Sequence, residues 1–379
     1  MNWSPPAVQS HLDVIDSHAY WQHPHFPGRP WDPSNWTINN IPMAGRPDGG
    51  TLPSLGLSRI AGMPFLCTEY NHAAPNEFSA ETAPLIFGYA ALQDWDGVFL
   101  FAYSHRSGRS WDTGHFGSFF DIDQHPAKLA NLPAAALAFR RGDLASRPPI
   151  VERVSPELFL ERLRGRGPWG ILGNDTRAFS TTRSEALTQA VAREITEDLP
   201  RTVNLDGRQA TRVTPPSTGW SWSSRNGHGV AVLDTPRSKF IATSEVPNTY
   251  ELSGVTLETQ PNRLGWAVIT LSALDGPDMT SPGRLLVSAI GLVENTGMHW
   301  TDASRQSVGR NWGERPSLVE GISLSLRLGV PASRVRAWPL DERGSRRADP
   351  IRVESVSDGA RIPLGPHART LWYEVEITP

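Results

Sequence analysis

The sequence is poor in residues on which several common protein classes depend. It has one cysteine, Cys67, in 379 residues, which excludes an intrachain disulfide and any cysteine-rich zinc or iron–sulfur site. Its only lysines are Lys128 and Lys239, so few side chains are available for Schiff-base chemistry. It also lacks a basic excess, with 36 Lys and Arg against 39 Asp and Glu and a net charge of −3. This balance argues against nucleic acid as the main partner.

Long hydrophobic runs are absent as well. PLIFGYAAL (84–92) and LPAAALAF (132–139) fall far short of the ~20 residues that a membrane-spanning helix requires, so we expect no membrane partner. The opening MNWSPPAVQS has neither the basic head nor the apolar core of a signal peptide, and the localisation of the protein stays open. By contrast, proline (33) and tryptophan (14) are abundant. Proline indicates many fixed turns, and tryptophan suits large cores or flat platforms for sugar rings.

The pattern of apolar and polar residues changes near residue 143. Before this point apolar strands alternate with helices, which predicts βα units around a parallel sheet. All three strands are apolar throughout, as expected when both faces of a sheet are covered. The strands are expected at 12–20, 63–70 and 97–105, and the helices at 79–95 and 126–141.

The later part of the chain has a different pattern. A helix is predicted to begin at Pro156, and from about residue 200 short strands alternate with turn signals. Strands at this spacing favour an antiparallel β-sandwich. We therefore expect an α/β region over 1–143, a helical connector over 144–200 and a β-sandwich over 201–379.

Each apolar strand of the first region ends in polar or aromatic residues. Because the active sites of parallel α/β barrels lie at the carboxyl ends of the strands, we expect these side chains to meet at one site. Glu69, with Tyr and His on neighbouring strands, suits a nucleophile, and glycoside hydrolysis uses one carboxylate as nucleophile and another as acid/base. The strand ends are Asp16, His18 and Tyr20; Thr68, Glu69, Tyr70, Asn71 and His72; and Tyr103, Ser104 and His105.

The same three segments resemble the last three strands of the (β/α)8 barrel in clan-A retaining glycoside hydrolases, which include cellulase-like family 5. FLCTEYNH resembles the seventh strand, DVIDSHAYW the sixth and DGVFLFAYSH the eighth. The resemblance implies that Glu69 is the nucleophile in retaining hydrolysis of β-linked oligo- or polysaccharides, with no metal or organic cofactor. It further implies a set of substrate-binding residues that orient Glu69 or contact the sugar: His18, Tyr20, Trp21, Asn71, His72, Tyr103 and His105.

The first region is shorter than the family's barrel. A whole barrel takes about 250 residues, so we expect only a partial (β/α)8 barrel, strands six to eight, followed by the sandwich. The acid/base Glu of the clan, at the end of strand four, has no counterpart here. We therefore expect the C-terminal part of a larger enzyme, catalytically incomplete by itself. The alternatives are a non-catalytic carbohydrate-binding protein and a subunit whose exposed strand edge is covered by a chain that supplies the missing strands.

Three clusters keep more than one interpretation. His18, His23 and His25 could serve a metal-dependent hydrolase, although no acidic partner stands at a recognisable interval. Trp21, Trp31 and Trp36 fit either a sugar platform or packing of the proline-rich loop. Trp300 and Trp312 fit either a carbohydrate-binding face or turns and packing at strand junctions.

Overall fold

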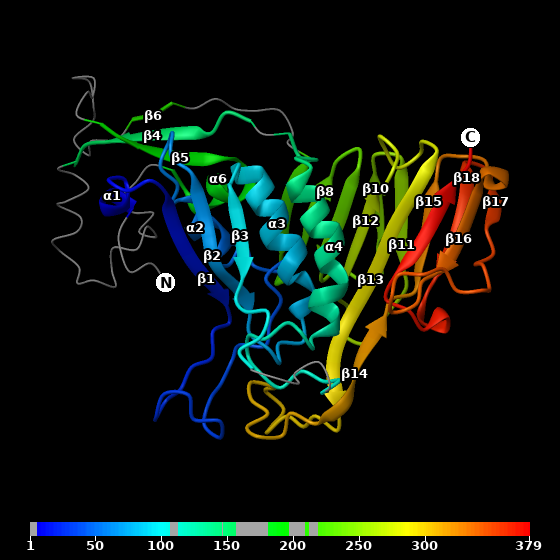
Figure 1. Cartoon of the computed structure of the whole chain (residues 1–379), viewed down its shortest axis with the longest axis horizontal. Coiled ribbons are helices and arrows are strands. Elements are labelled where there is room, and N and C mark those ends of the chain that lie inside the picture. Colours follow the sequence, from blue (N-terminus) through cyan, green and yellow to red (C-terminus); the bar gives the residue numbers. More distant parts are fainter. Residues whose placement is uncertain (1–5, 107–112, 146, 157–180, 197–208, 212–218) are drawn as a thin grey trace.

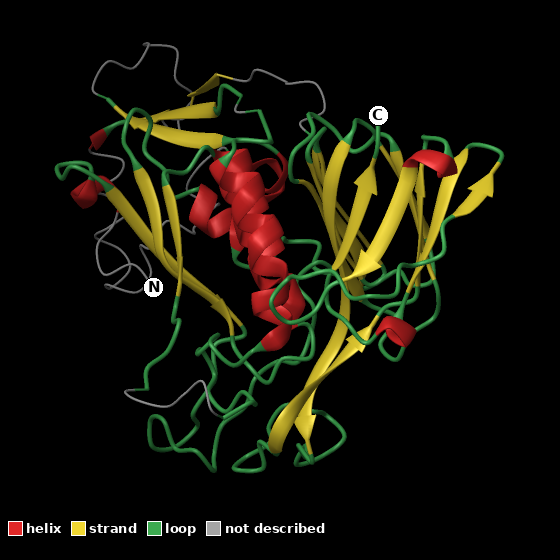
Figure 2. Cartoon of the chain, turned by 45° about the vertical axis from the view of Figure 1, so that its right-hand side comes forward, coloured by secondary structure: helices red, strands yellow, loops and turns green. Residues whose placement is uncertain are grey.

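The fold is dominated by β-sheet. In this computed structural model the strands form four sheets and the described helices are short. A parallel sheet lies at one end of the molecule and two antiparallel sheets lie at the other, with α3 (Thr82–Gln93) and α4 (Pro126–Arg140) between them (Figures 1 and 2). No helix in the described part of the chain is long and apolar enough to cross a membrane. The structure describes residues 6–106, 113–145, 147–156, 181–196, 209–211 and 219–379.

The parallel sheet consists of β1 (Ile15–Trp21), β2 (Phe65–His72) and β3 (Gly97–Leu100), in the order β1–β2–β3. Two steps along β1, from Asp16 to His18, correspond to three steps along β2, which therefore carries an extra residue. Such a bulge re-aims the side chains beside it.

The expected partial (β/α)8 barrel is wrong. Strands rather than helices make up most of the regular secondary structure of the described residues, and the parallel sheet stops at three strands. Between β1 and β2 the chain forms a long loop whose only helix is the five-residue α2 (Leu52–Gly56), instead of a crossover helix covering the sheet. After β3, helix α4 packs against α3 and the antiparallel strands. β1 is an edge strand of this sheet, and a second chain that covers this edge stays a prediction.

The part of the chain between α4 and β7 contains strands as well as a helix, and its three-stranded sheet lies next to the parallel sheet (Figure 1). β4 (Ile150–Val154) pairs in parallel with β5 (Val191–Ile195) and antiparallel with β6 (Gln209–Thr211). α6 (Arg183–Thr188) begins with a capping box formed by Thr182 and Glu185, which satisfies backbone N–H groups of the first turn. The region 144–200, expected as a helical connector, thus includes β4 and β5. The helix expected from Pro156 falls mostly on residues outside the described ranges.

Two antiparallel sheets make up the other end of the molecule. An eight-stranded sheet has the order β16–β19–β13–β12–β9–β8–β7, with β14 beside β13, and a five-stranded sheet has the order β10–β11–β15–β18–β17. Buried apolar residues from both, such as Ile269, Val287 and Leu326, form one core between them. The other face of the larger sheet packs on α3 through Trp220 and Phe240.

The bounds of these strands complete the description of the fold. The larger sheet comprises β7 (Trp220–Arg225), β8 (His228–Asp234), β9 (Ser238–Thr243), β12 (Ala267–Ala273), β13 (Gly283–Thr296), β14 (Glu314–Gly321), β16 (Val335–Pro339) and β19 (Tyr373–Ile377). The smaller comprises β10 (Thr249–Leu252), β11 (Val255–Thr259), β15 (Leu324–Leu328), β17 (Glu354–Val356) and β18 (Gly359–Leu364). Short helical turns are α1 (Pro6–Gln9), η1 (Ser79–Glu81), η4 (Ala332–Arg334) and η5 (Pro366–Ala368).

An arm of the larger sheet reaches the loops of the parallel sheet. β13 extends beyond its neighbours and pairs with β14 (Figure 1). In the loop between them, Gln306 accepts a hydrogen bond from the backbone of Ile38 at 2.8 Å. Trp312 stacks on the buried Trp36 with ring centroids 5.7 Å apart. Both tryptophans thus pack the long loop after β1 against the arm.

Candidate functional site

Glu69 lies near the carboxyl end of β2 and is partly open to solvent, with 33% of its side chain exposed. The Tyr20 hydroxyl donates a hydrogen bond to Glu69 Oε2 at 2.5 Å. His18 Nδ1 lies 3.6 Å from the same oxygen. Within the described part of the chain, no contact engages Oε1. One carboxylate oxygen is therefore held by the protein, and the other has no hydrogen-bond partner among the described residues.

Asp16, His18 and Thr68 form the base of this cluster. Thr68 Oγ1 donates to Asp16 Oδ1 at 2.7 Å, and His18 Nε2 lies 2.8 Å from Asp16 Oδ2 and 2.6 Å from Thr68 Oγ1. Burial raises the pKa of Asp16, but the hydrogen bonds from His18 and Thr68 and the charge of His18 outweigh it and hold the pKa below its usual value. Asp16 is therefore an ionised anchor that fixes the His18 ring beside Glu69.

The bulge in β2 explains how neighbouring side chains reach the same cluster. Alternate residues of a regular strand point to one face, as Asp16, His18 and Tyr20 do on β1. Consecutive residues of β2 both contact this face, because Thr68 binds Asp16 and Glu69 binds Tyr20. The extra residue thus brings the carboxylate beside the phenol.

Tyr20 keeps its proton in this setting. Burial first, and then the hydrogen bond to the neighbouring Glu69 carboxylate, raises the pKa of the Tyr20 phenol far above its ordinary value. A neutral phenol is an O–H donor, whereas a phenolate is not. Tyr20 therefore remains a hydrogen-bond donor to Glu69 over the whole physiological pH range.

Aromatic side chains surround the cluster. The Tyr20 ring packs on Phe120 and Phe101, with centroids 4.8 and 5.9 Å apart. Trp31 and Tyr103 expose 57% and 53% of their surfaces, and Trp31 reaches Phe120 at 6.4 Å. Their flat apolar faces suit the apolar faces of sugar rings.

The other expected site residues fall into two groups. His105 is half exposed on the loop after β3, with Nδ1 2.5 Å from Asp121 Oδ1. Trp21, Asn71 and His72 are buried. Trp21 donates its indole N–H to the Ile41 carbonyl at 3.1 Å. The structure therefore brings His18 and Tyr20 to Glu69 and places Tyr103 and His105 at the surface. It leaves Trp21, Asn71 and His72 with almost no surface that a ligand could contact.

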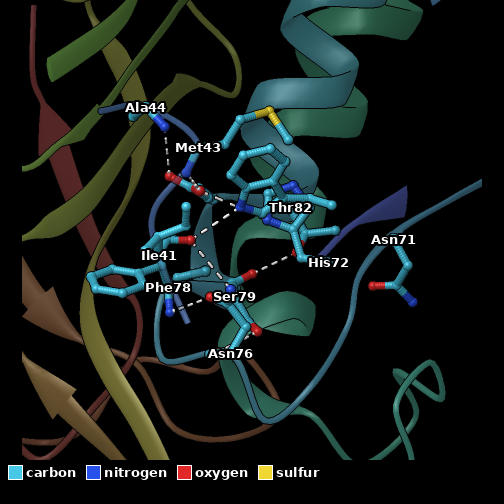
Figure 3. A network of polar contacts seen from close by, with 12 residues as sticks. Ile41, Met43, Ala44, Asn71, His72, Asn76, Phe78, Ser79 and Thr82 are labelled. Carbon is cyan, nitrogen blue, oxygen red and sulfur yellow. Dashed lines mark hydrogen bonds and ion pairs between the residues drawn. The ribbon is translucent and has the colours of Figure 1, made fainter. Parts of the chain in front are cut away.

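A second polar network lies buried behind β2 (Figure 3). Glu81 accepts backbone hydrogen bonds from Met43 and Ala44, and its Oε1 lies 3.8 Å from His72 Nδ1. His72 Nε2 lies 2.8 Å from the Tyr70 hydroxyl. Burial raises the pKa of Glu81 to about 8, and burial with the nearby Lys128 lowers the pKa of His72 well below its usual value. Both groups are therefore neutral at pH 7, and the network supports the strand that carries Glu69.

The buried carboxyl makes the stability of the protein depend on pH. The folded chain keeps the Glu81 proton up to about pH 8, whereas an unfolded chain loses it near 4.5. The stability that the protonated Glu81 side chain gives to the folded protein is complete below about pH 4.5 and is lost as the pH rises towards 8. Glu81→Gln removes this loss. We expect the unfolding free energy of the variant, relative to wild type, to rise by on the order of 1 kcal/mol per pH unit across that window.

Urea unfolding of both proteins near pH 5 and near pH 8 measures this difference. Glu342→Gln, at an exposed position of a turn, is the control for removing a carboxylate from the surface. A stability difference between Glu81→Gln and wild type that is the same at both pH values would contradict the expectation.

The described residues offer no support for a metal site. No group of three His, Cys, Asp or Glu side chains within the described ranges is arranged to hold a metal ion. His23 Nδ1 lies 2.8 Å from the Pro24 carbonyl, and the backbone of His25 pairs with Thr37. Cys67 is a buried thiol whose pKa burial raises far above its usual value. The metal-dependent alternative based on the three histidines therefore has no geometric basis.

Two aromatic residues of the site were not anticipated. Phe101 and Phe120 line Tyr20, yet the segment around Phe120 looks like an ordinary loop in the sequence. The available signal was the aromatic pair Phe119–Phe120, which stands shortly before the predicted helix at 126–141.

Comparisons of the chain with protein-family models, with curated proteins and with solved structures find no match.

Proposed function

We propose that the surface around Glu69 binds a β-linked carbohydrate and that Glu69 is the nucleophile of a retaining glycoside-cleaving reaction. The observation that carries this proposal is the asymmetric environment of the carboxylate. Tyr20 and His18 both approach Oε2, whereas Oε1 has no hydrogen-bond partner among the described residues, on a side chain that is 33% exposed. A nucleophilic carboxylate needs this arrangement, with one oxygen oriented by donors and the other facing the reacting carbon.

The chemistry follows from these contacts. Glu69 Oε1 would attack the anomeric carbon, the bond from that carbon to the leaving oxygen would break, and a glycosyl ester on Glu69 would form. Water would then hydrolyse the ester and restore the carboxylate. Tyr20, which stays protonated, would keep Oε2 in place during both steps.

A complete retaining enzyme also needs an acid/base carboxyl group about 5–5.5 Å from the nucleophile. In the described part of the cluster the other carboxylate is Asp16, which is bound by Thr68 and His18 and has a lowered pKa. An ionised, fully engaged carboxylate is a poor proton donor. We therefore expect cleavage only of glycosides whose leaving group departs without a proton, such as dinitrophenyl glycosides.

Covalent labelling tests the proposal directly. The protein is incubated with dinitrophenyl 2-deoxy-2-fluoro-β-glycosides of several sugars, in which the fluorine slows hydrolysis of the ester. We expect one equivalent of dinitrophenolate, a mass increase of one fluoroglycosyl group, and the label on the peptide that contains Glu69. Glu69→Gln should remain unlabelled. A folded wild-type protein that takes up no label from any sugar, or takes it up at another residue, would refute the proposal.

Carbohydrate binding without reaction is the second candidate. The engagement of Asp16 favours it, because no free acid accompanies Glu69 in the described residues. Titration calorimetry with β-linked oligosaccharides separates the two candidates. Binding of an oligosaccharide by a protein that resists labelling supports the non-catalytic role, whereas labelling at Glu69 supports the nucleophile.

Tyr20→Phe is expected to slow labelling about 10–100-fold at saturating reagent. The variant loses the hydrogen bond to Glu69 Oε2 but keeps the ring packing, and a hydrogen bond to a charged group contributes about 1.5–3 kcal/mol. The apparent affinity for the reagent should change little. Tyr373→Phe, which removes a hydroxyl bound to the Gly365 carbonyl in the larger antiparallel sheet, is the matched control. An unchanged labelling rate in Tyr20→Phe would contradict this role.

A further inference from the structure

Lys128 is a fully buried lysine that has no ion-pair partner among the described residues. Its side chain on α4 is 1% exposed, and no carboxylate of the described residues forms an ion pair with it. Instead, Nζ donates to Asn71 Oδ1 at 2.7 Å and to the His72 carbonyl at 2.6 Å. Burial lowers the pKa of Lys128 to about 7, because a buried charge held only by neutral groups is costly to the fold. Both of its partners belong to the end of β2, two and three residues beyond Glu69.

Asn71 connects this lysine to two other segments. Its Nδ2 donates to the Phe101 carbonyl and to the Phe120 carbonyl, both at 2.6 Å. In Figure 3 the Asn71 side chain lies apart from the network around His72. One amide therefore joins β2, the chain after β3 and the loop that precedes α4.

Lys128 determines which way this amide lies. Lys128 Nζ donates to the Asn71 oxygen, and both the ammonium and the neutral amine of a lysine carry N–H donors for this acceptor. The amide nitrogen must then face the Phe101 and Phe120 carbonyls. With the amide reversed, its oxygen would lie against two carbonyl oxygens and the connection would be lost.

Phe101 and Phe120 also contact the residue that holds Glu69 in place. Their rings pack on Tyr20 at 4.8 and 5.9 Å, and Tyr20 holds Glu69 Oε2. Contacts therefore run without interruption from Lys128 through Asn71 and the two phenylalanines to Tyr20 and the carboxylate.

We propose that Lys128, acting through the Asn71 amide, is a positioning residue that sets the place of Tyr20 and thereby of Glu69. The inference rests on the proposed function in that it takes Glu69 as the nucleophile. It assigns Asn71 to the support of the site rather than to contact with the substrate.

The two lysines of the chain provide a matched experiment. Lys239 is also 1% exposed and binds Asp234 and the Thr235 carbonyl, in the antiparallel part of the fold. Both Lys128→Met and Lys239→Met should lower stability. Only Lys128→Met should lower the maximal rate of labelling at Glu69, by about 10²-fold, since small displacements of reacting groups have effects of this size. Reagent affinity should change far less.

A second variant covers the case in which Lys128→Met does not fold. Asn71→Asp keeps an acceptor for Lys128 and gives it a counter-ion, but it has no N–H for the Phe101 and Phe120 carbonyls. We expect the same selective loss of labelling rate. Labelling at the wild-type rate in the folded Lys128 or Asn71 variant would overturn the inference.

A readout that needs no reaction separates this inference from the proposed function. 4-Fluorophenylalanine placed at position 120 reports the packing of that ring by fluorine NMR. Its resonance should shift or broaden in Lys128→Met and Asn71→Asp and stay in place in Lys239→Met. If the wild-type protein takes up no label, the proposed function fails. The fluorine spectra would still show whether Lys128 and Asn71 position the Phe120 ring. Unchanged spectra in both site variants would refute the role of Lys128.

Discussion

Replacing Glu69 by alanine is expected to lower the cleavage of dinitrophenyl β-glycosides by at least about 10⁴-fold, the scale seen when a nucleophile is removed. Because these substrates need no general acid, the measured decrease in rate reports the loss of the nucleophile alone. The variant leaves a space beside Tyr20 where the carboxylate stood. Azide should enter it and attack the anomeric carbon from the same side, giving a glycosyl azide with inverted configuration. Stopped assays for dinitrophenolate and proton NMR of the product measure both effects.

Asp16→Ala is the matched control, because it removes the other carboxylate of the same cluster. It should reduce the rate by loosening His18 and Thr68, and azide should not restore it. Retention of the wild-type rate by Glu69→Ala would exclude it as the nucleophile. An azide product from Asp16→Ala instead would move the nucleophile to Asp16.

The elements of the parallel sheet could be predicted from the sequence, but their assembly could not. Strands expected at 12–20 and 63–70 lie at Ile15–Trp21 and Phe65–His72, and the helix expected at 126–141 lies at Pro126–Arg140. The strand expected at 97–105 is shorter and ends at Leu100. Local apolar patterns determine such segments. Whether a parallel sheet closes into a barrel depends on which faces its connections cover, and residues 22–64 show no apolar periodicity that reveals this.

Some strands of the antiparallel sheets could be predicted from their local sequence, and others could not. β7 and β8 form a hairpin whose turn is Asn226–Gly227, both with positive φ (53° and 80°). Asn-Gly is the typical sequence of such a turn, so this hairpin could have been predicted. β14 is different, because its ERPSLVEG sequence has few apolar residues and it pairs only with the extended end of β13.

The candidate site was predictable where regular geometry holds. His18 and Tyr20 stand at alternate positions of β1, and the parallel register aligns His18 with Glu69. Beyond the bulge the alternation of β2 fails, and Tyr70, Asn71 and His72 are all buried. A bulge has no single-residue signature here. Lys128, from a helix far along the chain, could be connected to Asn71 only by the fold.

Gly88→Ala is expected to destabilise the protein by about 2–3 kcal/mol, although alanine favours a helix over glycine by about 1 kcal/mol. Gly88 lies in α3 where the helix meets the larger antiparallel sheet. A Cβ there would lie 2.7 Å from Phe240 Cε1 and 2.8 Å from Trp220 Cζ3, and closer still to Phe240 Cζ. Both rings are buried, so neither can move away without repacking the core, and overpacking costs outweigh the propensity. Urea unfolding measures the difference.

Phe240→Leu supplies the control that identifies the cause. The shorter side chain by itself should cost about 1 kcal/mol or more through the cavity it leaves, but it makes room for a methyl group at position 88. The double variant should therefore be more stable than the sum of the single effects predicts, with a coupling energy of about 1 kcal/mol or more. Additive effects, or stabilisation by Gly88→Ala alone, would contradict close packing of α3 on this sheet. Because α3 lies between the parallel sheet and the antiparallel one, this contact decides how firmly the strand that carries Glu69 is held against the rest of the fold.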